Sequence, residues 1–483
     1  MKRLLLISLF LLAAVRLDAQ WLDSNVYDRP LKEVLEQVGK QYGVELLYEE
    51  KNVRGRIVKS APWRFYDDAE ATLDNILRPL DMRWTAKAPG VYEIKKWEYF
   101  RKPYAEGEKH LKRLLALYPT REAFEARKAR IRTHILATLG LDSLKKCDLA
   151  PLRSNLRQHD GYTVENIALE VLPGVWVSGS LYMPAQVRGR IPVLLSPHGH
   201  FYNKTDTSIP DERGRYRPDQ QLRCAMLAKM GAAVFSYDMW AWGESALAFR
   251  LKDHRSDLGI VMQTWQSIRI LDYLCTRPWT DTTRVGVTGA SGGGTQTMVI
   301  AALDDRITLS VPVVMLSSHF FGGCPCESGL PIHILPGEPM SNNAELGALT
   351  APHPQLVISD GHDWTVTVPQ IEYPYLQKVY KLYGARDKVR NVHLPAEQHD
   401  YGVNKRRAMY DFVAEQFGLR TEGLRNADGS YREETVTVEH APEMYVFGPE
   451  GRLPDHAVKG SGALRKLLRE YRIEPKTHKD NLR

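Results

Sequence analysis

Short apolar segments alternate with longer amphipathic ones through the middle of the chain. Continuous apolar runs with the length of buried strands occupy residues 191–196, 232–237, 285–288, 356–359 and 389–394. The intervening stretches carry apolar residues at helical spacing, and 259–274 is the longest of them. Buried strands that alternate with helices are typical of a mainly parallel sheet covered on both faces. The pattern therefore predicts an α/β fold for residues 142–419.

A smaller unit with its own pattern of apolar and polar residues precedes this region, at residues 21–97. Apolar residues recur at helical spacing in 31–42 and again in 69–80, and Gly43 ends the first helix. Strands are expected at 44–48, 53–58, 82–85 and 91–95, the last two forming a hairpin that turns at Pro89-Gly90. This β-α-β-β-α-β order predicts a small α+β domain.

The segments on either side of the central region are more polar. Residues 98–141 are charged and predicted to form two helices, 109–118 and 121–139, which bridge the units and cover one side of the larger one. Residues 420–483 form a C-terminal extension with one strand-like alternation, 434–438, and a basic amphipathic helix, 464–471.

The first 19 residues have the pattern of a secretory signal. Lys2 and Arg3 precede an apolar core at 4–15, and Leu17-Asp18-Ala19 forms a passable cleavage site. The apolar core is too short for a comfortable membrane span. We therefore expect export across an inner membrane, into a periplasm.

Composition and charge exclude several classes of protein. Hydrophobic residues make up 43% of the chain and charged residues 25%, which fits neither wholesale disorder nor a membrane bundle. A net charge of +7 over 483 residues, without a basic stripe, gives no indication of nucleic-acid binding. Five cysteines are few and odd in number for an exported protein. Cys324 and Cys326 could pair, but are expected to be small buried residues.

The motif with the most specific chemistry is GASGGG, residues 289–294. It lies between the apolar run 285–288 and a helix-like segment, which is the context of a nucleophile elbow. The turn strains the serine backbone and leaves no room for side chains at the positions two residues before and after the serine. Gly289 and Gly293 meet this requirement because glycine has no side chain. Ser291 is therefore the predicted nucleophile. A phosphate-binding loop is the alternative, but its lysine is missing.

A serine nucleophile needs a histidine base and a carboxylate that orients it, in the chain order Ser, Asp, His for this fold. His399, after the run 389–394, is the predicted base. Asp363 and Asp360 both follow the run 356–359, and Asp363 is preferred because it lies further into the loop. Asp360 stays an alternative that could cap the turn, and Glu327 is a third candidate.

Backbone N–H groups of Gly292 and His200 are expected to form the oxyanion hole. Gly292 follows the nucleophile, and His200 follows the glycine of the loop PHGH at 197–200. The spacing of His198 and His200 does not suit a helical metal-binding pair, and no acidic cluster lies nearby in sequence. We therefore expect no metal and no cofactor.

The motifs GASGGGTQT, PHGH, YDMWAWGES, GCPCE and EQHDYG together resemble bacterial α/β-hydrolases of the acetyl-xylan-esterase-like kind, over roughly residues 111–419. The resemblance implies the α/β-hydrolase fold and a serine-hydrolase mechanism. Residues 21–97 resemble the short N-terminal domain of secretins and TonB-dependent outer-membrane proteins, where it is a periplasmic protein-interaction module. A structural spacer is the alternative for this unit.

Three functions are compatible with these features. The first is a secreted serine esterase that removes acetyl or related acyl groups from plant-type polysaccharides or oligosaccharides through an acyl-enzyme. Aromatic residues in loops near the expected site would suit sugar rings, although at least half are expected to be packing residues, which is the default for any single one: Phe201, Tyr202, Trp240, Trp242 and Trp364. The alternatives are a prolyl-oligopeptidase-like peptidase, which lacks its propeller repeats here, and a non-catalytic scaffold that works through residues 21–97.

Overall fold

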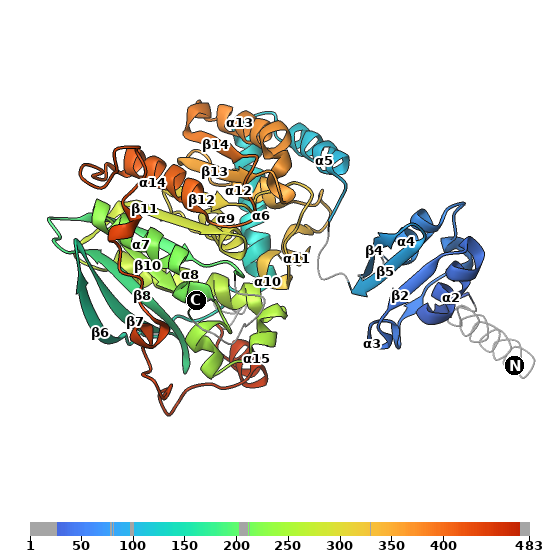
Figure 1. Ribbon diagram of the computed structural model, residues 1–483, viewed down its shortest axis with the longest axis horizontal. Helices are drawn as coiled ribbons and strands as arrows, with labels where there is room; N and C mark the ends of the chain where they lie inside the picture. Colours follow the sequence, from blue (N-terminus) through green and yellow to red (C-terminus); the bar gives the residue numbers. More distant parts are fainter. Residues whose placement is uncertain are drawn as a thin grey trace, which may run out of the picture. The chain divides into compact units, whose positions relative to one another are not determined.

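The computed structural model describes residues 27–77, 80, 82–96, 101–201, 211, 213–328 and 330–473. The chain divides into two compact units, Met1–Phe100 and Arg101–Arg483 (Figure 1). The expected signal segment 1–19 lies outside the described residues, as do Tyr202 and the end of the tail. Within the described part, every helix is too short or too polar to cross a lipid bilayer.

The N-terminal unit has the two helices and the hairpin that its pattern predicts. Helix α2 (Leu31–Tyr42) buries Leu31, Val34, Leu35 and Val38 and ends at Gly43, whose φ is 64°. Helix α4 (Ala69–Leu77) packs with it on a three-stranded sheet of order β2 (Glu45–Tyr48), β5 (Val91–Lys96), β4 (Met82–Ala88). The buried apolar residues form one cluster, so this unit has a hydrophobic core of its own.

The strand predicted at 53–58 is mostly wrong. Helix α3 (Glu50–Val53) occupies its start, and only β3 (Ile57–Val58) is extended, paired with β1 (Arg29–Pro30). Gly55 lies between α3 and β3 with a φ of 73°, a conformation that turns the chain. A glycine in the left-handed region therefore interrupts an apparently continuous apolar alternation.

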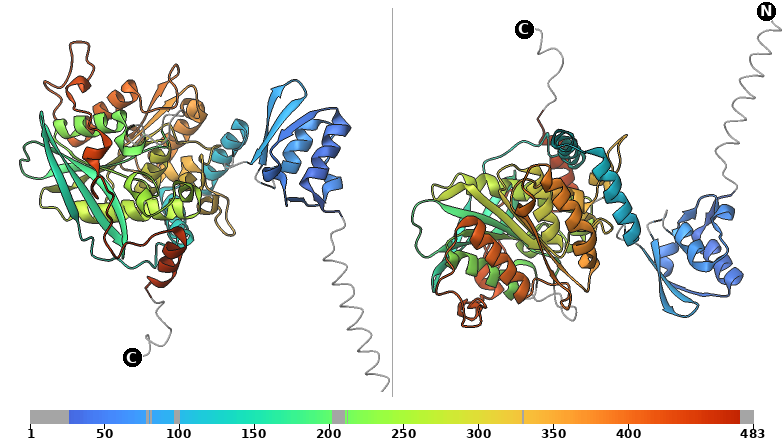
Figure 2. Two further views of the ribbon diagram at one scale, coloured as in Figure 1. Left: turned by 60° about the horizontal axis from the view of Figure 1, so that its bottom comes forward. Right: turned by 90° about the horizontal axis from the view of Figure 1, so that it is seen from above.

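The second unit is built on a nine-stranded sheet. From one edge to the other its strands are β14 (Val389–Leu394), β13 (Gln355–Asp360), β12 (Leu309–Val313), β11 (Thr280–Ala290), β9 (Ile191–Pro197), β10 (Ala233–Tyr237), β8 (Val175–Pro184), β7 (Tyr162–Leu172) and β6 (Leu152–His159). The strands from β14 to β10 are parallel. Strands β8, β7 and β6 extend the sheet in antiparallel fashion at one end (Figure 2).

Helices cover both faces of this sheet, as predicted. On one face α7 (Pro218–Met230) and α14 (Val403–Phe417) contribute to a buried hydrophobic cluster together with residues of β9 to β13. On the other, α9 (Gly292–Leu303) packs on β11 and β12 and contacts α8 (Leu258–Cys275). This is the α/β-hydrolase fold, in which the carboxyl ends of the parallel strands carry the loops that form the site.

The second of two helices near the start of this unit is joined to it by a buried ion pair. Helix α5 (Tyr104–Leu117) precedes α6 (Arg121–Leu139), which begins where Thr120 accepts a hydrogen bond from the backbone of Ala123. The guanidinium of Arg127 on α6 donates to both carboxylate oxygens of Glu345, at 3.1 and 3.0 Å. Both side chains are fully buried, so α6 is an integral part of this unit.

The strand predicted at 434–438 is absent, and the structure has a short turn of helix, η10 (Glu433–Thr435), at its start. Glu433 accepts hydrogen bonds from Arg406 and Tyr410 on α14. These side-chain bonds, rather than a strand ladder, hold the segment against the unit. The helix predicted near the end is confirmed as α15 (Ser461–Glu470).

Candidate active site

Ser291 lies in the sharp turn between β11 and α9. Its φ of 56° and ψ of −122° lie outside the regions that L-residues normally occupy. A Cβ on Gly289 would lie 2.5 Å from the carbonyl oxygen of Pro197 and 2.7 Å from the backbone of Gly293. A Cβ on Gly293 would also collide with the Pro197 oxygen. The glycines that the sequence predicts for this turn are thus sterically required.

His399 and Asp363 lie in line with Ser291. Nε2 of His399 is 2.9 Å from Oγ of Ser291, positioned to accept the hydroxyl proton. Nδ1 of His399 donates to Oδ2 of Asp363 at 2.6 Å. The other oxygen of Asp363 accepts from the backbone and hydroxyl of Thr365, at 2.5 and 2.6 Å, which fixes the carboxylate plane. The structure therefore brings the three preferred residues together, and adds Thr365, which sequence reasoning missed.

Asp360, the alternative acid, contacts groups other than His399. Its carboxylate lies 3.3 Å from the ammonium of Lys405 and accepts from the backbone of His362 at 3.1 Å, the turn-capping role expected of the second aspartate. Burial, followed by the charge of Asp363, raises the pKa of Asp360 above its usual value. Asp360 is thus a buried structural partner of Lys405.

The loop after β9 runs beside the nucleophile. A Cβ on Gly292 would lie 2.7 Å from the ring of His200, so these two residues are neighbours, as an oxyanion hole built from both requires. His198 is buried, donates through Nδ1 to the carbonyl of Gly199, and accepts from the backbone of Met239 at 3.1 Å. Burial lowers the pKa of His198 to about 3. This histidine braces two loops of the site in its neutral form.

The GCPCE segment packs against the same loop. Oε1 of Glu327 accepts from Nδ1 of His200 at 2.9 Å, so Glu327 serves a different histidine from the one proposed as base. Burial by itself raises the pKa of Glu327, but hydrogen bonding and attraction to His200 outweigh it and leave this pKa lowered. Cys324 and Cys326 are joined by a disulfide, which corrects the expectation that they are merely small buried residues.

Two of the candidate aromatic residues lie against His399. The ring of Trp364 is 4.6 Å from the imidazole and that of Phe201 5.5 Å, and both rings are half-buried. Trp240 and Trp242 are buried and belong to the packing of the domain. Only the first pair is therefore placed to meet a substrate among the four described candidates.

Comparisons with known proteins agree with this architecture. Residues 228–323, which include Ser291, match the family model described as glucuronyl esterase, fungi. A solved structure named methylesterase BT1017 is 43% identical, with a TM-score of 0.77, and the match covers 91% of this chain and 98% of that one. Such a match is longer than the second unit alone and extends into the first. Comparison with curated protein sequences gives no match.

Two further solved structures are more distant. A Bacteroides fragilis protein described as an acetyl xylan esterase is 17% identical, with 65% of this chain and 86% of that one covered and a TM-score of 0.45. A glucuronoyl esterase from Solibacter usitatus is 17% identical, with coverage of 62% and 94% and a TM-score of 0.45. The identity to the methylesterase, over nearly all of both chains, decides the family: this chain belongs to the family of methylesterase BT1017 and is an enzyme, a serine-type hydrolase of carboxylic esters.

Proposed function

We propose that this enzyme cleaves ester bonds on polysaccharides through an acyl-enzyme on Ser291, with His399 as general base and Asp363 as the acid that orients it. The observation that carries the proposal is a pair of consecutive hydrogen bonds that link Asp363 to His399 and His399 to Ser291. Ser291 lies in a strained turn between a strand and a helix. A serine hydroxyl becomes a useful nucleophile when an oriented imidazole can take its proton.

In the proposed reaction, Nε2 of His399 takes the proton of Ser291 as the serine oxygen bonds to the ester carbonyl carbon. The carbonyl oxygen becomes an anion, which the N–H groups of Gly292 and His200 stabilise. His399 then gives its proton to the departing alcohol, leaving an acyl-serine. Water attacks this ester in the same way, and the acid and the free hydroxyl of Ser291 are released.

We propose that the ester is a methyl ester of a uronic acid, in place of the acetyl ester expected from the sequence motifs. The relative that matches nearly the whole chain is named a methylesterase, and the matching family model is named for glucuronyl esters. In such a substrate the acyl group is itself a sugar. The half-buried rings of Trp364 and Phe201 beside His399 offer apolar faces for that sugar.

A cation near these rings suits an acidic polysaccharide. The guanidinium of Arg217 lies 5.7 Å from the centre of the Phe201 ring, and Asp219 holds its Nε at 2.8 Å. Its remaining N–H groups can bind the carboxylate of an unesterified neighbouring uronate. We therefore assign Arg217 to substrate binding outside the reacting ester.

The test is a panel that separates the two products. Pectin, a glucuronoyl methyl ester, acetylated xylan and a proline peptide are offered to the enzyme, and methanol, acetate and amine are measured. We expect methanol from the first two. Ser291→Ala should lower the rate at least about 1,000-fold without loss of folding, and a fluorophosphonate should label Ser291 in the unmodified enzyme. Acetate as the main product would restore the acetyl assignment, and an active Ser291→Ala enzyme would end the mechanism.

For the N-terminal unit we propose a role as a protein-interaction module of an exported enzyme. The proposal rests on the resemblance of residues 21–97 to secretin and TonB-type short N-terminal domains, on the signal-like pattern of residues 1–19, and on the separate hydrophobic core of this unit. Its partner would be a periplasmic or outer-membrane protein. Fractionation of cells that express the full chain, followed by pull-down with the isolated unit, tests both points.

A further inference from the structure

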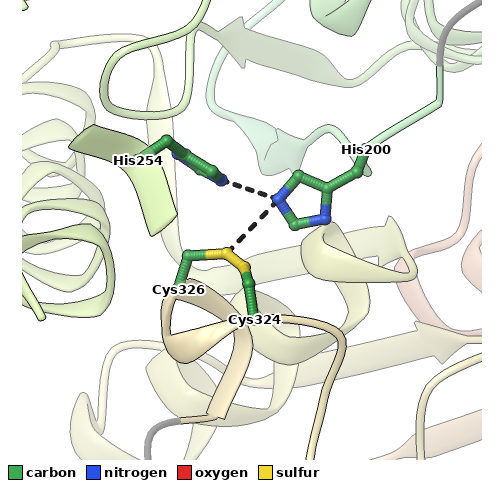
Figure 3. A group of neighbouring side chains, drawn as sticks. All are labelled: His200, His254, Cys324 and Cys326. Atoms are coloured by element: carbon green, nitrogen blue, oxygen red, sulfur yellow. Dashed lines mark hydrogen bonds between the residues drawn. A yellow bond between two sulfur atoms is a disulfide. The ribbon is translucent and has the colours of Figure 1, made fainter. Parts of the chain in front are cut away.

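Four side chains of the kinds that bind metals meet beside the nucleophile loop: His200, His254, Cys324 and Cys326 (Figure 3). One ligand atom of each lies within 4.8 Å of the others. His200 follows β9, His254 lies in the short helix η6 (Leu251–Arg255), and the cysteines flank the start of α10 (Pro325–Ser328). Three of the four are buried and His200 is half-buried.

The two imidazole rings present the same kind of atom to each other. Nε2 of His200 lies 2.6 Å from Nε2 of His254. Nδ1 of His254 faces the carbonyl oxygen of Trp240 at 2.6 Å, which only an N–H can satisfy. Nδ1 of His200 faces the Glu327 carboxylate at 2.9 Å, which also requires an N–H. Both Nε2 atoms therefore direct lone pairs into one space, and a positive centre must lie between them.

The sulfur atoms decide what that centre is. Sγ of Cys326 lies 3.5 Å from the same Nε2 of His200, so a cation there has sulfur as well as nitrogen donors within reach. A shared proton would make no use of the sulfurs. Once the disulfide between Cys324 and Cys326 is reduced, two imidazoles and two thiolates are available, and this is a donor set that zinc prefers.

The outer contacts of both histidines are those of metal ligands. Ligating histidines almost always give their second ring N–H to a carboxylate or a backbone carbonyl, as His200 gives to Glu327 and His254 to Trp240. The ring of Trp242 lies 5.6 and 5.8 Å from the two imidazoles and adds an apolar wall. These contacts orient both Nε2 atoms before any metal binds.

The cysteine segment is held equally firmly. The backbone carbonyl of Cys326 accepts from Gln263 of α8 at 2.9 Å. A Cβ on Gly259 of the same helix would lie 2.8 Å from the Cβ of Cys326, so the helix backbone packs directly on this residue. The Cα atoms of the two cysteines are 5.1 Å apart, and rotation of their side chains can direct both sulfurs toward the histidines.

We infer that His200, His254, Cys324 and Cys326 form a structural zinc site in the reduced enzyme. Zn²⁺ displaces one proton from each thiol, binds the two thiolates and the two neutral Nε2 atoms, and undergoes no redox change. The disulfide is the alternative state of the same residues. Its reduction consumes two electrons and two protons from a thiol or phosphine reductant before the metal can bind.

A site closed by four protein ligands leaves no open position for water or substrate, so this zinc takes no part in the chemistry. Its effect is to fix the position of the His200 ring. The ring of His200 packs on Gly292, which directly follows the nucleophile. Fixing that ring fixes the loop whose backbone N–H we assign to the oxyanion hole. The expectation of no metal rested on the spacing of His198 and His200, and the proposed ligand set leaves His198 out.

The test uses the full chain, purified without chelator in the presence of a phosphine reductant. Elemental analysis should find about one zinc ion per chain. Replacement by Co²⁺ should give the intense visible absorption of tetrahedral cobalt with thiolate ligands. Cys326→Ser and His254→Gln should lose the metal, while the matched control Cys275→Ser, at a half-buried thiol elsewhere, should keep it. Glu327→Gln should weaken zinc binding by about 10–100-fold.

Each remaining outcome decides the matter. If the reduced, zinc-supplemented wild-type chain retains no zinc, the inference is wrong, whatever the variants do. Zinc that persists in Cys326→Ser places the metal elsewhere and also overturns it. If peptide mapping of the reductant-treated chain still finds Cys324 linked to Cys326, with free thiols only at Cys147, Cys224 and Cys275, the two cysteines cannot bind zinc and the inference is wrong.

Discussion

Replacing Asp363 with asparagine changes one hydrogen bond of the candidate triad and little else. Asparagine keeps an acceptor oxygen for Thr365, which Oδ1 of Asp363 binds at 2.5 and 2.6 Å. Its amide can turn an N–H toward Nδ1 of His399, where the aspartate had an oxygen at 2.6 Å. The imidazole then moves its proton to Nε2, which lies 2.9 Å from Oγ of Ser291 and can no longer accept the hydroxyl proton.

The expected loss follows from that change of tautomer. In a triad of this kind it lowers kcat by about 10⁴, or about 5 kcal/mol of transition-state stabilisation. KM should stay nearly constant because substrate binding does not involve this proton. Steady-state kinetics on a soluble methyl ester measure both constants. Thermal unfolding should shift little, since the turn keeps its acceptor.

Asp360→Asn is the matched control. The carboxylate of Asp360 touches Lys405, which keeps other oxygen partners: Oδ1 of Asp400 at 2.8 Å, the carbonyl of Gln398, and Oε2 of Glu397 at 3.4 Å. Burial raises the pKa of Asp360, so the fold already disfavours its charge. We expect a loss of about 1–3 kcal/mol in unfolding free energy and a kcat close to wild type. A folded Asp360→Asn enzyme with the larger loss of kcat would refute the assignment of Asp363.

Three further predictions concern binding, pH and domain structure. Arg217→Gln should raise KM for polyuronates several-fold and leave kcat on a small aryl ester unchanged. The control is Arg390→Gln, which lies at the opposite ends of the strands and should change neither constant. Equal effects of Arg217→Gln on both substrates would contradict a binding role. Burial lowers the pKa of His110 to about 4, so the stability that its neutral ring provides is complete above about pH 6.5 and falls by roughly 3 kcal/mol as the pH drops to about 4. Melting curves of wild type and His110→Gln over that range should converge at the acid end, and parallel curves would show that His110 is not responsible. A chain that begins at Arg101 should fold and hydrolyse a small aryl ester at close to the full-length rate, and an inactive but folded product would mean that the first unit helps to build the site.

The parts of the fold that the sequence predicted are those set by local constraints. The strands β9, β10 and β13 are short runs that are buried along their whole length, and few other residues can fill such positions. The turn at Ser291 admits only glycine at Gly289 and Gly293, so its pattern survives in the sequence. The order of nucleophile, acid and base then followed from the topology.

The failed predictions depended on partners that are distant in sequence. The alternation at 434–438 suits a strand, but Glu433 is held by Arg406 of α14, and no neighbouring strand pairs with it among the described residues. Packing was the expectation for at least half of the loop aromatic residues, and Trp240 and Trp242 are packed into the domain, but the sequence could not tell them from Phe201 and Trp364. Composition and spacing carry no information on which way a loop side chain turns.

The contrast between two carboxylate–histidine pairs shows where sequence reasoning reaches its limit. Asp363 and Glu327 both follow parallel strands of the sheet, and each binds Nδ1 of a histidine, at 2.6 and 2.9 Å. What separates their roles is the atom that the other ring nitrogen faces. Nε2 of His399 meets the hydroxyl of Ser291, whereas Nε2 of His200 meets a second imidazole and a sulfur. We propose the same oriented imidazole as a base in the first setting and as a metal ligand in the second, and only the three-dimensional arrangement distinguishes them.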